Sequence, residues 1–129
     1  MLWGWHAKHQ ATVKQHEKWQ YQYRFKLRLA HENFDADLTQ EDIPPLPPGK
    51  TTVDVIADFL RLMSVFILTT VQEKAAQAIT KRDIKWCLTV PAQWTPKARA
   101  AMHRAAVLAG IVKVGEYPRN PVVVLTFTH

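Results

Sequence analysis

Four prolines stand within nine residues in the segment Asp42–Lys50, which reads Asp-Ile-Pro-Pro-Leu-Pro-Pro-Gly-Lys. Proline lacks a backbone N–H and holds φ near about −65°, so this segment cannot continue a helix or a central strand. We expect an extended connector over residues 42–50, between a first segment, 1–41, and a second, 51–112, with residues 113–129 as a tail of the same 129-residue domain. Such a connector is either a plain linker, which we favour, or a proline-rich ligand for a partner groove.

The composition is that of a globular chain, with 47% hydrophobic and 22% charged residues. The 17 Lys and Arg exceed the 11 Asp and Glu, but they are scattered, which indicates a solvated basic surface and makes nucleic-acid binding an unlikely function. The longest apolar stretch, Phe59–Val71, is shorter than the roughly 20 residues that span a bilayer, so no membrane partner is expected. A single cysteine, Cys87, and a start without a signal peptide favour the cytoplasm.

The first part of the chain is compatible with a helix over residues 5–18 and then changes to strict alternation of apolar and polar residues over Trp19–Leu29. Period two predicts a half-buried strand, whose polar face is basic through Arg24, Lys26 and Arg28. Trp19, Tyr23 and Leu27 also stand four apart, so a helix stays open as the alternative.

After the connector, Thr51 and Asp54 form a helix-capping signal, and apolar residues then recur at three- and four-residue steps. We expect a long amphipathic helix from about Thr52 to Ile79. Its middle, Val65–Leu68, is apolar all round, which predicts that other parts of the protein cover it on two sides.

The remaining segments predict a strand over Ile84–Val90, a helix over Lys97–Ala109, and further strands from Ile111 and over Val122–Phe127. Thr95 and Pro96 suit the start of that helix, and Gly110 suits its end. Strand, helix, strand indicates one βαβ unit and an α/β fold class.

The residues alone identify no catalytic site. His6, His9 and His16 fall near one face of a helix with Glu17, but no second cluster completes a metal shell, so exposed histidines are the better interpretation. Cys87 lies in the predicted buried strand, where we expect a small hydrophobe. No glycine-rich phosphate loop is present in the sequence.

A more specific pattern is Thr89-Val90-Pro91-Ala92, followed by Arg99 and by Ala109-Gly110-Ile111. It resembles the nucleotide-binding domain of the seventy-kilodalton heat-shock protein (Hsp70) family, an actin-like ATPase. Trp94 and the stretches Trp19–Leu29 and Val53–Arg61 are similar to the divergent branch called member-twelve-like. The resemblance covers about residues 3 to 112.

This resemblance implies a partial actin-like (ribonuclease H-like) α/β domain that, when complete, binds ATP and Mg²⁺ and works with protein clients or co-chaperones. Pro91 and Arg99 match positions that relay nucleotide state, and Lys26 matches, more loosely, a lysine that stabilises phosphoryl-transfer charge. The family's phosphate loops have no counterpart in this sequence, so we expect a chaperone-type fragment without ATPase activity of its own.

Two other expectations follow. A non-enzymatic interaction module, acting through the connector or the basic strand face, is the alternative function. Where the family's other strands would cover apolar residues, we expect exposed patches near Phe59–Leu68, marginal stability and self-association.

Overall fold

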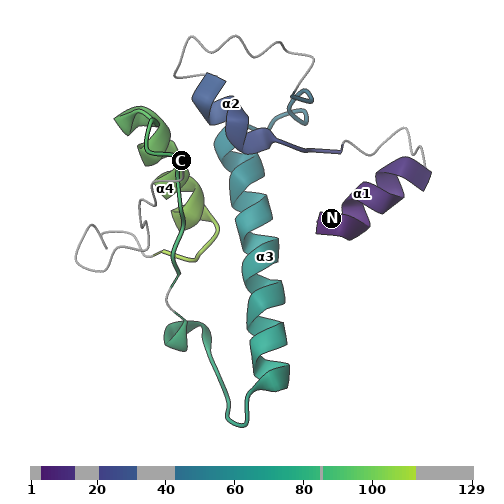
Figure 1. The fold of residues 1–129 in the computed structure, drawn as a ribbon, viewed down its shortest axis with the longest axis vertical. Coiled ribbons are helices and arrows are strands. Elements are labelled where there is room, and N and C mark those ends of the chain that lie inside the picture. The colour runs from purple at the N-terminus through teal and green to yellow at the C-terminus, as the bar shows by residue number, and fades with distance from the viewer. Residues whose placement is uncertain (1–3, 14–20, 32–42, 85, 113–129) are drawn as a thin grey trace.

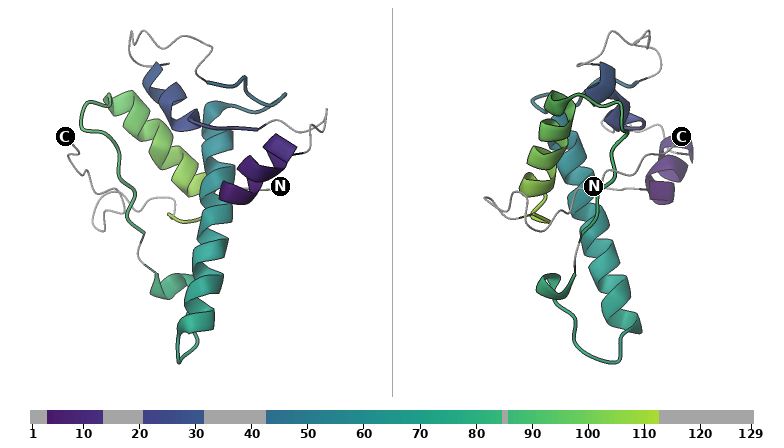
Figure 2. Two further views of the ribbon diagram at one scale, coloured as in Figure 1. Left: turned by 45° about the vertical axis from the view of Figure 1, so that its right-hand side comes forward. Right: turned by 60° about the vertical axis from the view of Figure 1, so that its left-hand side comes forward.

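The computed structural model describes residues 4–13, 21–31, 43–84 and 86–112. Within these residues every regular element is helical. They are α1 (Gly4–Val13), α2 (Phe25–His31), α3 (Thr52–Lys74), the short 3-10 helix η2 (Lys81–Asp83) and α4 (Pro96–Leu108). Helix α3 runs along the long axis of the molecule, and α2 and α4 pack against its first half (Figures 1 and 2).

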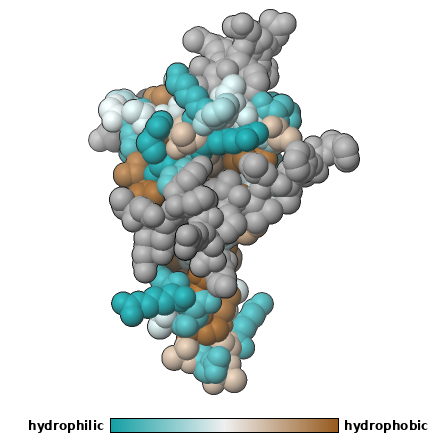
Figure 3. Space-filling view, turned by 90° about the vertical axis from the view of Figure 1, so that its left-hand side faces the viewer, coloured by the Kyte–Doolittle hydropathy of each residue, from teal (hydrophilic) through white to brown (hydrophobic). Residues whose placement is uncertain are grey.

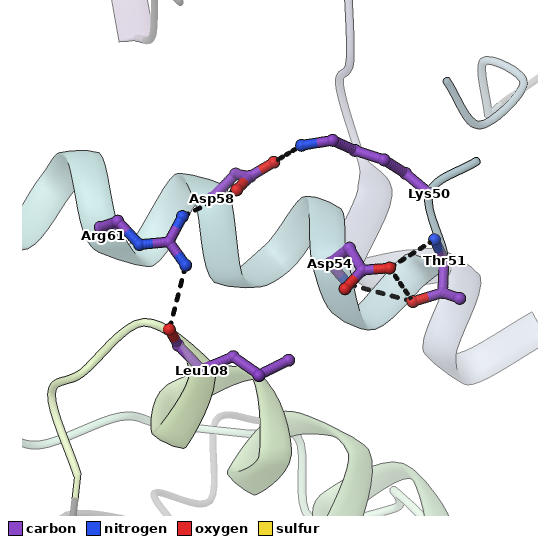
Figure 4. A network of polar contacts seen from close by, with 6 residues as sticks. All are labelled: Lys50, Thr51, Asp54, Asp58, Arg61 and Leu108. Carbon is purple, nitrogen blue, oxygen red and sulfur yellow. Dashed lines mark hydrogen bonds and ion pairs between the residues drawn. The ribbon is translucent and has the colours of Figure 1, made fainter. Parts of the chain in front are cut away.

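Helix α3 begins at the predicted capping signal. The Asp54 N–H donates to the Thr51 hydroxyl over 3.2 Å, and the Thr51 N–H donates to the Asp54 carboxylate over 2.8 Å (Figure 4). This reciprocal pair satisfies two donors that a helix start otherwise leaves open. The helix ends at Lys74 and not at Ile79, because Ala75 adopts an extended backbone conformation.

Helix α4 confirms its sequence signals closely. The Thr95 side chain accepts a hydrogen bond from the Ala98 N–H over 3.2 Å, and Pro96 occupies the first turn. Gly110 follows the helix with φ of 74°, a conformation that costs glycine nothing.

The core lies where α2, α3 and the alanine-rich face of α4 meet. Small side chains on α4 let it approach α3 closely, since the distance between packed helices depends on the residues at the contact. The buried cluster consists of Leu29, Ile56, Ala57, Leu60, Leu88, Val90, Trp94, Ala98, Ala101, Met102, Ala105, Ala106 and Ala109.

The predicted α/β fold with a βαβ unit is wrong for the described residues, which contain no strand or sheet. The predicted strand over Trp19–Leu29 gives way to helix α2 from Phe25 onward, with residues 14–20 outside the description. Phe25 and Leu29 share one helical face: the Phe25 ring lies 5.3 Å from that of Phe59, and Leu29 is 1% exposed. Leu27, which a strand would have buried beside them, is 39% exposed. The basic strand face proposed for Arg24, Lys26 and Arg28 is therefore wrong as well.

The predicted strand over Ile84–Val90 is not present among its described residues, Ile84 and 86–90, which have no regular secondary structure. Its side chains still alternate, with Leu88 and Val90 buried against the helices and Cys87 and Thr89 exposed. The expectation of a buried Cys87 is consequently wrong. An extended segment becomes a strand only when a neighbour pairs with its backbone. The strand predicted over Val122–Phe127 lies outside the described residues.

The second half of α3 is less covered than its apolar sequence predicted. None of its described residues beyond Ser64 is buried, and Val65 and Phe66 are 51% and 55% exposed. The two-sided cover expected for Val65–Leu68 is therefore wrong. Hydrophobic atoms reach the surface in the lower part of the molecule, where this half of α3 lies (Figure 3). Among the described residues, no helix combines the length and the apolar character needed to cross a membrane.

Candidate functional site

The residues singled out by the resemblance gather around one turn, Pro91–Trp94, which leads into α4. The Trp94 N–H donates to the Pro91 carbonyl over 3.1 Å and closes the turn. Pro91 supplies the carbonyl that closes the turn, and its ring, which fixes φ and removes the N–H donor, ends the extended segment before it. The Trp94 side chain, 5% exposed, anchors the other end in the core.

Arg99 holds this turn from the first part of α4. Its guanidinium Nη2 donates to the Ala92 carbonyl over 2.8 Å. The Nε atom of the same side chain is buried and has no acceptor among the residues that the structure describes. A buried donor without an acceptor costs free energy, so an alternative position of this side chain that satisfies Nε would compete with the observed one.

Lys26 approaches the same segment from α2. Its ammonium donates to the Thr89 carbonyl over 3.4 Å and lies 6.0 Å from the centre of the Trp94 ring. Burial lowers the pKa of Lys26, because a low-dielectric environment disfavours the charged form. The Lys26 side chain therefore links α2 to the segment that precedes α4.

The structure therefore brings Lys26, Pro91 and Arg99 to one place. Two cations hold main-chain carbonyls of residues 89 and 92, on either side of Pro91. This arrangement positions the turn. The catalytic role of Lys26 and the relay roles of Pro91 and Arg99 stay predictions.

The described residues do not supply a metal centre. No group of three or more His, Cys, Asp or Glu side chains lies together in the part of the chain that the structure describes. His6 and His9 are exposed on α1, in agreement with the interpretation favoured for them, and His16 and Glu17 fall outside the description.

Two further polar contacts join α2 and the residues just before it to the proline connector, and neither was predicted from the sequence. Arg28 donates to the Pro44 carbonyl over 2.6 Å, and Gln22 donates to the Pro45 carbonyl over 2.8 Å. Proline has a carbonyl acceptor but no N–H donor, so a proline-rich segment offers carbonyls that its own prolines cannot bond. Long polar side chains near such a segment were the signal that could have predicted these contacts.

A third network surrounds the start of α3. Lys50, the last residue of the connector, forms an ion pair with Asp58, and Arg61 donates to the same carboxylate over 2.9 Å. Arg61 also donates to the Leu108 carbonyl at the end of α4 over 3.0 Å (Figure 4). The connector, α3 and α4 are thus linked through charged side chains.

Comparison with known proteins gives three relatives with similar coverage. The chain is 31% identical over 106 residues to heat shock 70 kDa protein 12B of Homo sapiens, a match that covers 81% of this chain. It is 27% identical over 105 residues to heat shock 70 kDa protein 12A of Homo sapiens and of Mus musculus, each covering 80% of this chain. The chain spans about 15% of the length of these relatives. No family model and no solved structure matches the chain. These matches confirm the predicted resemblance as a divergent and partial one.

Proposed function

Because this chain is a divergent and partial relative of the heat shock 70 kDa proteins 12A and 12B, we propose that it is a segment of an Hsp70-like ATP-binding domain that does not hydrolyse ATP by itself. The observation that carries this proposal is the match to protein 12B, which includes 81% of the chain. Chaperone action, protein clients and co-chaperones belong to the proposal for the whole protein. In this segment we assign Lys26, Pro91 and Arg99 a positioning role and not a catalytic one.

The turn at Pro91–Trp94 supports a positioning role. Lys26 on α2 and Arg99 on α4 each hold a carbonyl of the segment around Pro91. A displacement of α2 relative to α4 would therefore pull on residues 89 to 92, where proline restricts the conformations that can absorb it. This is the mechanical property that a relay of nucleotide state requires.

ATP and Mg²⁺ do not fit the described residues as a complete site. Phosphoryl transfer depends on charges and metal ligands held around the phosphates. The one lysine that the resemblance offers for this purpose, Lys26, donates to Thr89, and the described residues hold no cluster of metal-ligating side chains.

The test is a measurement of phosphate release by the purified 129-residue chain with ATP and Mg²⁺. We expect no turnover above the protein-free rate, and no difference between the unaltered chain, Lys26→Ala and the control Lys97→Ala, which alters an exposed lysine on α4. Steady hydrolysis that Lys26→Ala abolishes and Lys97→Ala leaves intact would overturn the proposal.

A further inference from the structure

The connector carries a directional sequence pattern beyond its proline content. Pro45 and Pro48 stand three apart, and a cation, Lys50, follows two residues after the second proline. Proline-rich segments repeat every three residues in the polyproline II conformation, so prolines at this spacing share one edge. Grooves of stacked aromatic rings, as in SH3 domains, bind such an edge.

The structure presents this edge outward. Pro45 and Pro48 are exposed, whereas Pro44, Leu46 and Pro47 between and beside them are partly covered. Arg28 and Gln22 hold the carbonyls of Pro44 and Pro45 on the side of α2. Each carbonyl oxygen has a second lone pair, so these contacts fix the segment without using up its acceptors. Restraint of Pro44 and Pro45 lowers the conformational entropy that this part of the segment loses when it binds.

Lys50, the cation of this pattern, is bonded within the chain through both its backbone and its side chain. Lys50 donates its N–H to the Pro47 carbonyl over 3.1 Å, in a turn that Gly49 permits with φ of 74°. Its ammonium is paired with Asp58 on α3, whose side chain is 17% exposed. The lysine is therefore folded back onto α3, and its charge is partly neutralised there.

From these observations we propose that Pro44–Lys50 is a docking segment for an SH3-type groove with a carboxylate pocket beside its aromatic rings, and that Asp58 competes with this pocket for Lys50. The prolines provide the contact with the aromatic rings. Lys50 fixes the direction of the segment, because it reaches an acidic pocket at one end only of the groove. Pairing with Asp58 weakens docking until the lysine is released.

The proposal is tested by isothermal titration of the full 129-residue chain with a panel of purified SH3 domains that have acidic pockets. We expect measurable binding that falls by about tenfold or more in Pro45→Ala/Pro48→Ala, because a few central contacts carry most of an interface's affinity. The matched control Pro118→Ala/Pro121→Ala, which alters two prolines outside the connector, should bind as the unaltered chain does.

The competition is tested by Asp58→Asn, which should tighten binding about two- to fivefold, as expected for the loss of a partly exposed ion pair. The control Asp83→Asn makes the same charge change on η2 and should have no effect. In the Lys50→Gln background, Asp58→Asn should no longer tighten binding.

Three results would overturn the proposal. No SH3 domain binds the unaltered chain or Asp58→Asn; or binding survives the loss of Pro45 and Pro48; or the chain binds WW domains, whose grooves also accept proline, but no SH3 domain. Circular dichroism of each variant shows whether a lost signal reflects docking or unfolding. If Asp58→Asn is less helical than the unaltered chain, Lys50→Gln alone decides the role of the cation, since it must weaken binding.

Discussion

The guanidinium of Arg61, in the middle of α3, donates a hydrogen bond to the main-chain carbonyl of Leu108, the last residue of α4, over 3.0 Å. Carbonyls at a helix end lack partners within the helix and carry partial negative charge. A cation at this point satisfies an acceptor and also connects two helices through residues that stand 47 positions apart along the chain.

We therefore expect Arg61→Met to lower the free energy of unfolding by about 1 kcal/mol, because it removes the hydrogen bond to Leu108 together with an exposed ion pair to Asp58 that adds little. Methionine keeps the aliphatic part of the side chain and removes the charge. Urea denaturation followed by circular dichroism provides the measurement. Arg104→Met, an equal change at an exposed position of α4, serves as the control, and an equal loss in both variants would rule out a specific role for the Leu108 contact.

The cap at Thr51 gives a second prediction. Thr51→Ala removes the oxygen that accepts the Asp54 N–H, and loss of such a cap typically costs about 1 kcal/mol. Thr51→Ser keeps a hydroxyl at the same place and should retain most of the stability. If serine and alanine destabilise the chain equally, the threonine acts through its methyl group and not through capping.

Asp54 makes the same cap sensitive to pH. The Thr51 N–H and, secondarily, the Thr51 hydroxyl hold the pKa of Asp54 below its ordinary value. Since the folded-state pKa is lowered, the stabilisation is present above the ordinary carboxyl pKa and is lost as pH falls through the folded value. The difference in unfolding free energy between the unaltered chain and Asp54→Asn should thus shrink on acidification from neutral pH. A difference that is constant with pH would show that the carboxylate charge contributes nothing.

The parts of the fold that could be predicted from the sequence are those whose signals lie within a few neighbouring residues. The Thr51–Asp54 pair, Thr95 with Pro96, and Gly110 each act within four residues of their own position, and all three mark the helix boundaries as expected. The strand predictions were wrong because the pairing of strands depends on residues that are far apart in the sequence. Alternation over Trp19–Leu29 says which side chains could share a face, but a strand also needs a neighbouring backbone, which the sequence pattern does not specify.

The same reasoning applies to the site. The resemblance named Lys26, Pro91 and Arg99 together, and the structure places all three around one turn. It could not indicate how they meet, since Lys26 reaches Thr89 across 63 residues of sequence. The resemblance also did not indicate that Arg28 and Gln22 contact the connector. These side chains donate to main-chain carbonyls, which every residue carries, so no sequence motif marks the contact.

The core gives a further prediction. Ile56, 1% exposed, lies at the centre of the packing between α3 and its neighbours. Ile56→Ala should cost about 2–5 kcal/mol through lost burial and the cavity left behind. That range approaches the whole stability of a small domain, about 5–15 kcal/mol, so we expect the variant to be largely unfolded at 37 °C by near-ultraviolet circular dichroism. Val65→Ala, which alters a half-exposed residue on the same helix, should leave the spectrum unchanged, and an intact Ile56→Ala spectrum would place the core elsewhere.

The second half of α3 supports the last prediction, which concerns self-association. Fully burying a large apolar side chain is worth roughly 1.5–3 kcal/mol, and Val65 and Phe66 leave about half of their surface in water. We expect the chain to unfold with less than about 5 kcal/mol and to show a concentration-dependent mass in sedimentation experiments. Val65→Glu should shift that mass toward the monomer, because association would have to desolvate the new carboxylate. Leu108→Glu, at a 53% exposed position on α4, provides the comparison and should not shift it. A monomeric chain with a cooperative transition above about 5 kcal/mol would show that the helices of this segment already bury enough apolar surface to be stable alone.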